Sequence, residues 1–145
     1  MSSKFLLSAL AGAAVVFIFG YLIYGVLLTD FMRDHSGTAT GVAKNANEFQ
    51  FAYIILANLL YGFMLAFIFS KSGTATLAKG FGTALVIGFL TSASNDFISY
   101  GTANVLTLPS LAADVAGFSI LSGLAGVAVA WVRGLGKPAA RPTAA

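Results

Sequence analysis

FLLSALAGAAVVFIFGYLIYGVLL, residues 5–28, contains no charged side chain. A helix of this length reaches about 36 Å, which is enough to cross a hydrocarbon core of roughly 30 Å. Lys4 and the Ala-Gly-Ala of residues 11–13 resemble parts of a signal peptide. The apolar run, however, continues well past the roughly 7–15 residues of a signal-peptide core. We therefore predict an uncleaved transmembrane helix.

Three further apolar runs follow this one, at residues 51–70, 80–99 and 109–132. Pro109 suits the first turn of a helix, where its missing N–H costs nothing. The runs are continuous rather than alternating, which excludes a closed β-barrel. The sequence predicts an all-α membrane protein, a four-transmembrane-helix bundle. It forms a single domain over residues 1–135, with a flexible cytoplasmic tail over 136–145.

The composition agrees with lipid as the solvent. Hydrophobic residues make up 58% of the chain and charged residues 9%, whereas soluble domains carry about 25% charged residues. Cysteine is absent, so disulfides and thiolate sites are excluded.

The basic residues divide unequally between the two sides of the predicted membrane. One side, which holds both ends of the chain and the loop after the second run, carries six of the eight: Lys4, Lys71, Lys79, Arg133, Lys137 and Arg141. The other side carries Arg33 and Lys44. Because basic residues concentrate in cytoplasmic loops, we expect both termini in the cytoplasm. Orientation explains these residues better than nucleic-acid binding does, so no nucleic-acid partner is expected.

Two carboxylates lie inside the apolar runs, Asp96 in the third and Asp114 in the fourth. A carboxylate at the bilayer centre costs about 2.5–3.5 kcal/mol, so such groups are informative. Both lie toward the outer ends of their helices, at similar depth. They could share a proton or hold a cation, or they could cap helix ends and hydrogen-bond across helices.

Other polar residues accompany this pair in the outer half. Asn95 lies beside Asp96 on the third run, and Asn58 lies about two turns inside the second run. Asp30 follows the first run, where the polar outer half would open to the outside. The hypothesis is a ligand or ion site made of Asp96, Asp114, Asn58, Asn95 and Asp30. Asn58 serves equally well as a hydrogen-bonding bridge between helices.

Several kinds of chemistry have no support in the sequence. His35 is the only histidine, and we interpret it as a solvated loop residue. No metal site and no cofactor is predicted, because the chain lacks a clustered ligand set and the paired intramembrane histidines that haem would need. No catalytic set and no phosphate-binding glycine loop is present, so an enzyme is the least supported class.

Small residues recur at helical spacing in the last two runs. The residues are Ala84, Gly88 and Ser92 in one, and Ser119, Gly123, Gly126 and Ala130 in the other. Such faces let helices approach closely in lipid, either within one bundle or between two copies. A weak echo at offsets of 36–37 residues, SGTAT at Ser36 and Ser72, raises the possibility of an inverted repeat.

Four stretches carry a resemblance to a known group. They are YLIYGVLLTDF at 21–31, NLLYGFMLAFIF at 58–69, SNDFISYGTAN at 94–104 and GVAVAWVRG at 126–134. The chain resembles short bacterial four-helix membrane proteins of an uncharacterised family, a domain of unknown function. The resemblance implies four helices in the bacterial inner membrane and brings no activity with it. The membrane-associated eicosanoid and glutathione enzymes do not match, because their basic glutathione-binding positions are missing here.

The function expected from these observations is that of a small, non-enzymatic, multi-pass membrane protein. It would be a homo-oligomer or an accessory subunit of a larger membrane complex, with an acidic, polar outer half. The alternative is a transporter or channel for a small cation or polar solute.

Overall fold

The computed structural model of this chain describes residues 2–135 and is helical throughout its regular structure there. Four helical segments are long and apolar enough to cross a membrane: Ser3–Leu27, Phe51–Ser72, Leu77–Thr102 and Leu108–Gly134. The all-helical class and the four potential spans are thereby confirmed. The predicted tail over 136–145, with Lys137 and Arg141, lies outside the described residues.

The first span consists of two kinds of helix. α1 (Ser3–Gly20) begins at Ser2, whose hydroxyl accepts from the Phe5 backbone N–H at 3.3 Å. It continues directly into a π-helix, η1 (Tyr21–Leu27), and then into the short α2 (Thr29–Asp34). The apolar pattern predicted this helical segment but not the change to a π-helix, because a run of apolar residues is equally compatible with α-helical and π-helical turns.

The three remaining long helices have clear sequence signals at their ends. α3 (Phe51–Ser72) follows a single 3₁₀ turn, η2 (Ala46–Glu48), and ends at Gly73 in the left-handed region with φ of 70°. α5 (Leu108–Gly134) begins at Thr107, which forms a capping box with Ser110. α4 (Leu77–Thr102) extends three residues beyond the predicted run at each end, since a helix continues through polar residues that an apolar count leaves out.

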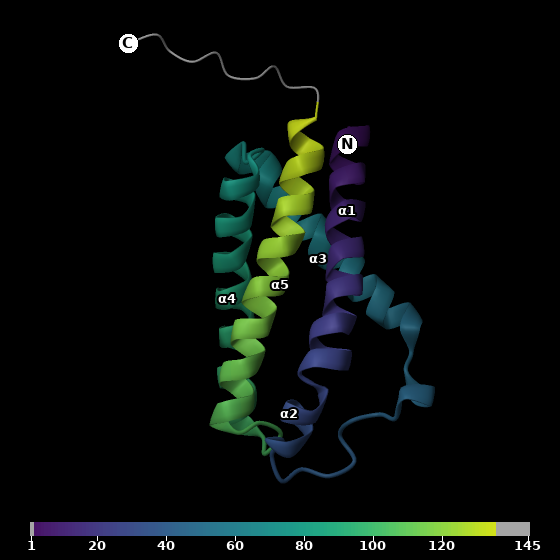
Figure 1. Cartoon of the computed structure of the whole chain (residues 1–145), viewed down its shortest axis with the longest axis vertical. Helices are drawn as coiled ribbons and strands as arrows, with labels where there is room; N and C mark the ends of the chain where they lie inside the picture. Colours follow the sequence, from purple (N-terminus) through teal and green to yellow (C-terminus); the bar gives the residue numbers. More distant parts are fainter. Residues whose placement is uncertain (1, 136–145) are drawn as a thin grey trace.

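The helices form an open row rather than a closed ring. α5 lies between α4 and α1 and packs along both, while α3 crosses behind and packs mainly on α1 (Figure 1). α3 meets α5 only briefly, and α3 and α4 barely touch. α3 is therefore packed mainly on the side that faces α1, and space is left on its other side, between α3 and α4.

Glycine and alanine set the closest helix contacts. A Cβ added at Gly80 of α4 would lie 2.6 Å from the Gly126 carbonyl oxygen of α5, and one at Gly62 of α3 would lie 2.6 Å from the Ala13 backbone nitrogen of α1. Neither pair has room for a larger residue. Gly126 belongs to the small-residue face of α5, and Gly80 lies one turn before Ala84 on α4. Both thus lie at helix contacts within the chain.

The two loops at one end of the row pair with each other. We call this the loop end; it comprises residues 28–50 and 103–107. Ser36 and Leu106 form an isolated antiparallel bridge, and the Ala39 N–H donates to the Asn104 carbonyl at 2.9 Å. The Thr107 hydroxyl also donates to the His35 carbonyl at 2.6 Å. The long first loop is thus tied to the start of α5.

Candidate functional site

Two carboxyl groups from neighbouring helices meet at one hydroxyl. The Ser92 Oγ lies 3.2 Å from Asp96 Oδ2, one turn further along α4, and 3.1 Å from Asp114 Oδ2 on α5. Spacing of four residues puts Ser92 and Asp96 on one face of α4. The close contact of α4 with α5 brings Asp114 to that same face. We call these three residues the Asp96–Ser92–Asp114 cluster.

The cluster contains more acceptors than donors. A serine hydroxyl carries one hydrogen, so it donates to only one of the two carboxyls at a time. If both carboxyls are ionised, one of them has no donor from Ser92 and two negative charges lie close together. In a low-dielectric medium this arrangement is unfavourable, and a shared proton or a bound cation relieves it.

The cluster lies inside two of the four potential spans but not at their middle. Asp96 is six residues before the end of α4, and Asp114 is six residues after the start of α5, so each is about 9 Å from the loop end of its helix. The Asp96 side chain is buried at 5% exposure. A buried ionisable residue within a span is a functional-site hypothesis by default.

A crevice opens beside the cluster, where α3 and α4 fail to pack. Its volume is about 320 Å³. α3 contributes Tyr61 and Met64, α4 contributes Asn95 and Asp96, and α5 contributes Asp114 and Phe118, with Thr91 and Ser92 completing the lining. The crevice therefore combines carboxyl, amide and hydroxyl groups with two aromatic rings.

A hydrogen bond holds the Tyr61 ring of the crevice in place, and the Phe118 ring packs against it. The Ser122 hydroxyl donates to the Phe118 carbonyl at 2.8 Å, so its own oxygen accepts from the Tyr61 hydroxyl at 2.7 Å. The Tyr61 and Phe118 rings then meet edge to face, with centroids 5.2 Å apart and planes at 70°. The Tyr61 part of this wall is thus anchored by a hydrogen bond, whereas the Phe118 ring is held by packing alone.

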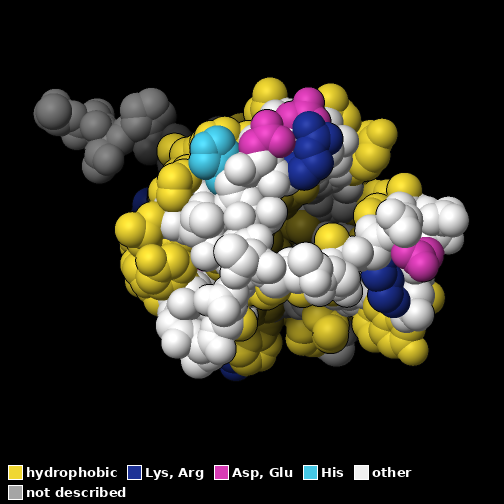
Figure 2. Space-filling view, turned by 90° about the horizontal axis from the view of Figure 1, so that it is seen from below, with side chains coloured by type: hydrophobic (Ala, Val, Ile, Leu, Met, Phe, Trp, Pro, Cys, Tyr) yellow, Lys and Arg dark blue, Asp and Glu magenta, His cyan; other side chains and the backbone are white. Residues whose placement is uncertain are grey.

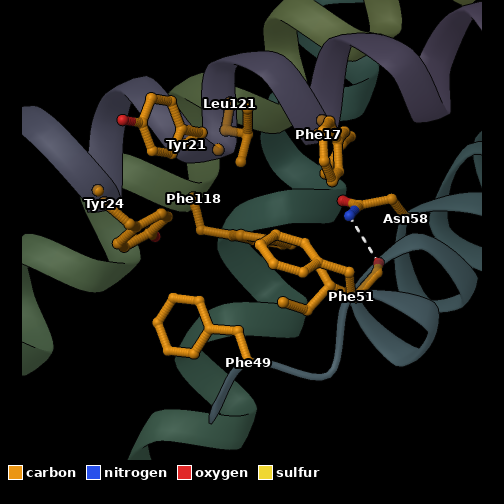
Figure 3. A pocket seen from close by; sticks show the side chains of 12 residues that line it. Phe17, Tyr21, Tyr24, Phe49, Phe51, Asn58, Phe118 and Leu121 are labelled. Carbon is orange, nitrogen blue, oxygen red and sulfur yellow. Dashed lines mark hydrogen bonds between the residues drawn. The ribbon is translucent and has the colours of Figure 1, made fainter. Parts of the chain in front are cut away.

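A second, larger cavity lies on the other side of Phe118. Its volume is about 490 Å³, and aromatic side chains make up half of its lining, which comes from α1, η1, α3, α5 and the loop residue Phe49. Figure 3 shows the rings of Phe17, Phe49 and Phe51 around it. Asn58 borders this aromatic cavity, and its amide donates to the Ile54 carbonyl of its own helix at 2.7 Å.

The predicted site residues are thus divided among three places. Asp96, Asp114 and Asn95 line one crevice. Asn58 lies at the aromatic cavity instead, where its amide bond is within α3 rather than between helices. Asp30 lies on α2 and pairs with Arg33 at 2.9 Å, with both side chains well exposed. The structure does not bring Asn58 or Asp30 to the two carboxyls.

The loop end carries a mixed set of charges. Asp30 and Asp34 flank Arg33, and the His35 ring stacks on Phe31 with centroids 4.2 Å apart. Figure 2 views this end and shows charged side chains around a hollow whose floor is apolar. The hollow lies between the loop and the helices. In this view (Figure 2) the charged side chains lie around its edge.

The opposite end, where α1 begins and α3 joins α4, carries basic residues. Lys4 donates to the Leu135 carbonyl, and Arg133 Nε donates to the Thr74 carbonyl at 3.2 Å. The Lys71 ammonium lies 5.7 Å from the Phe67 ring centroid. Among the residues that the structure describes, those at this end include basic side chains and no acidic one. We call it the terminal end.

Several residues at the site were not predicted as site residues. Ser92 is one of them, although its spacing of four from Asp96 puts both on one face of α4. Tyr61 and Phe118 form the aromatic wall, and the Tyr24 hydroxyl of η1 donates to the Asp114 carbonyl at 3.2 Å. Their spacing along the chain gives no signal, because the contacts depend on which helices become neighbours. The aromatic content of the runs is explained equally well by the belts at membrane interfaces.

The residue types present favour some ligands over others. Within residues 2–135, no group of three or more histidine or acidic side chains is positioned to share a metal ion. The two carboxyls, with a hydroxyl and an amide beside them, offer oxygen atoms that can hold a proton or a hard cation. Comparisons with family models, with curated proteins and with solved structures give no match for this chain.

Proposed function

We propose that this chain is a small integral membrane protein that binds a proton or a monovalent cation at the Asp96–Ser92–Asp114 cluster. We propose that it takes part in moving this ion across the membrane. The observation that carries the proposal is the single Ser92 hydroxyl between two carboxyls. One positive charge there removes the repulsion between the carboxyls and satisfies the one left without a donor.

The proposed setting is the bacterial inner membrane, with both termini in the cytoplasm. The separation of basic side chains at the terminal end from mixed charges at the loop end supports this orientation. The cluster then lies in the half of the membrane that faces away from the cytoplasm. A cation would approach from that side, or laterally through the crevice between α3 and α4.

A liposome flux assay tests the proposal. Purified wild-type protein is reconstituted, and uptake of protons or sodium is compared with uptake by Asp96→Asn and Asp114→Asn. Each substitution keeps the side-chain shape and removes a negative charge, so flux is expected to fall at least about tenfold, which corresponds to roughly 1.4 kcal/mol. Asp34→Asn, exposed beside Arg33, is the matched control. Equal flux in all variants, or none in the wild type, would refute transport.

We propose, second, that the chain acts as a homo-oligomer or as an accessory subunit of a larger membrane complex. The space between α3 and α4 supports this, because a single copy leaves that flank of the row without a helix. The tight glycine contacts near the terminal end also leave no wide path through one copy. A second copy or another subunit would complete the path.

Mass measurement of the protein in mild detergent, combined with a pull-down from native membranes, tests the second proposal. A defined oligomer, or a stoichiometric partner identified by mass spectrometry, is expected. A lone monomer that co-purifies with nothing would end this part of the proposal. Binding at the cluster would remain testable on its own.

A further inference from the structure

The crevice beside the cluster is much larger than an inorganic cation needs. Its volume of about 320 Å³ is on the order of ten times the roughly 30 Å³ that a water molecule occupies in the liquid. An ion held by two carboxyls would occupy only a small part of this space. Space next to a charge site, walled by side chains of several helices, indicates a ligand with a body as well as a charge.

The walls of the crevice indicate what kind of body fits. Tyr61 and Phe118 present aromatic rings, and Met64 adds a flexible thioether that adapts to irregular shapes. Aromatic faces attract cations within about 6 Å as well as packing against apolar groups. The polar groups, by contrast, gather at one part of the crevice, on α4 and at Asp114.

We propose that the ligand at this site is an organic cation, a substituted ammonium ion with an apolar or aromatic body. This rests on the proposed function, which it makes more specific. The ammonium group lies at Asp96 and Asp114. The body lies between α3 and α4 against Tyr61 and Phe118, where the absence of close helix packing leaves room for it.

The aromatic cavity extends the range of bodies that can be held. Phe118 lines both the crevice and the 490 Å³ aromatic cavity, so its ring is the wall that the two spaces share. Rotation of that side chain would join them. A ligand with a longer apolar part then reaches from the carboxyls toward Phe51 and Tyr21 without leaving the protein (Figure 3).

Equilibrium binding to the protein in lipid nanodiscs tests this inference with three probes. Benzyltrimethylammonium carries a permanent charge and a ring, tetramethylammonium carries the charge alone, and sodium is the inorganic ion. We expect benzyltrimethylammonium to bind roughly threefold to tenfold more tightly than tetramethylammonium, because its benzyl ring adds aromatic contacts with Tyr61 and Phe118, which contribute about 0.5–1.5 kcal/mol. Asp96→Asn and Asp114→Asn should weaken both organic cations at least about tenfold.

Phe118→Leu tests the contribution of the aromatic ring to binding separately from that of the two carboxyls. It keeps an apolar side chain at the shared wall and leaves the carboxyls in place. We expect it to weaken benzyltrimethylammonium more than tetramethylammonium, and so to remove most of the preference between the two, because only the benzyl ring loses an aromatic–aromatic contact. Asp34→Asn, away from both cavities, should bind all three probes as the wild type does. Circular dichroism and the elution volume show that each variant is folded.

The outcomes distinguish this inference from the proposal on which it rests. Sodium or proton binding that depends on both carboxyls, with no binding of either organic cation, overturns the inference and leaves the proposed function intact. Organic cations that bind equally well to Asp96→Asn and Asp114→Asn are only dissolving in apolar space, which also overturns it. No carboxyl-dependent binding of any cation overturns both.

Discussion

At the scale of single residues, Ser92 is the group that makes two acidic side chains into one site. Without it, Asp96 and Asp114 would be two carboxyls on adjacent helices with no common donor. With it, their oxygens lie within 3.2 Å of a single hydroxyl. Hydrogen bonds between helices in membranes average about 0.6 kcal/mol and reach about 1.7 kcal/mol.

Replacing Ser92 by alanine should therefore lower the free energy of unfolding by about 0.6–1.7 kcal/mol, because the bond between α4 and α5 is lost. Ser94→Ala is the matched control, since Ser94 is an exposed serine on the same helix. Unfolding in mixed detergent micelles, followed by circular dichroism, measures both. A Ser92→Ala protein as stable as Ser94→Ala would show that the bridge adds no stability.

Tyr24 offers a second test at this scale. Its hydroxyl donates to the Asp114 carbonyl and joins η1 to α5. Tyr24→Phe should lower the free energy of unfolding by about 0.6 kcal/mol. Tyr21 is 66% exposed, so Tyr21→Phe should leave the free energy of unfolding unchanged within error. The same denaturation assay measures the difference, and equal stabilities would contradict the assigned bond.

At the scale of elements, close approach of helix backbones holds α3 to the rest of the molecule. α3 packs mainly on α1, and Gly62 is at the centre of that contact, facing Ala9 and Ala13. In lipid no hydrophobic force presses helices together, so association depends on such close packing. The packing of α3 is consequently sensitive to one added methyl group at Gly62.

Gly62→Ala should separate α3 from α1 and lower the free energy of unfolding by about 1–3 kcal/mol, since the added Cβ meets backbone atoms that cannot move aside. Gly82→Ala is the control. A Cβ at Gly82 meets nothing within 4 Å, and alanine favours helix over glycine by up to about 1 kcal/mol. Unfolding in detergent should rank the two in opposite directions from wild type. A stable Gly62→Ala protein would refute this packing.

The helical elements were largely predictable from sequence, but their neighbours were not. The length of each apolar run gave the four spans, and Pro109 and Gly73 mark helix ends by known chemistry. Asp96 and Asp114 were expected at similar depth for the same reason. The partners Tyr61 and Phe118 could not be expected, because one-dimensional periodicity does not say that α3 turns away from α4. The placement of Asn58 at a different cavity has the same cause.

At the scale of the whole molecule, the described charges define two different ends. The loop end carries acidic and basic residues together, and the terminal end carries Lys4, Lys71, Lys79 and Arg133. The cluster lies nearer the loop end, and the close contact of Gly80 with Gly126 lies nearer the terminal end. In the proposed orientation the cluster lies nearer the outer side of the membrane.

Cysteine labelling tests the orientation, because the chain has no cysteine of its own. Thr38→Cys in the first loop should react with a membrane-impermeant maleimide added to intact cells. Ser72→Cys, near the terminal end, should react only after the cells are opened. The reverse pattern would invert the proposed topology, and labelling of both positions in intact cells would contradict a membrane-spanning arrangement.

Infrared difference spectroscopy of the protein in lipid nanodiscs tests the central claim most directly, because it observes the protonation of the carboxyl groups themselves. The account predicts a protonated-carboxyl stretching band in cation-free buffer that disappears when benzyltrimethylammonium or another bound cation replaces the proton. Asp96→Asn and Asp114→Asn should each remove that change, and Asp34→Asn should retain it. A wild-type spectrum with both carboxyls ionised and unaffected by any cation would contradict the account.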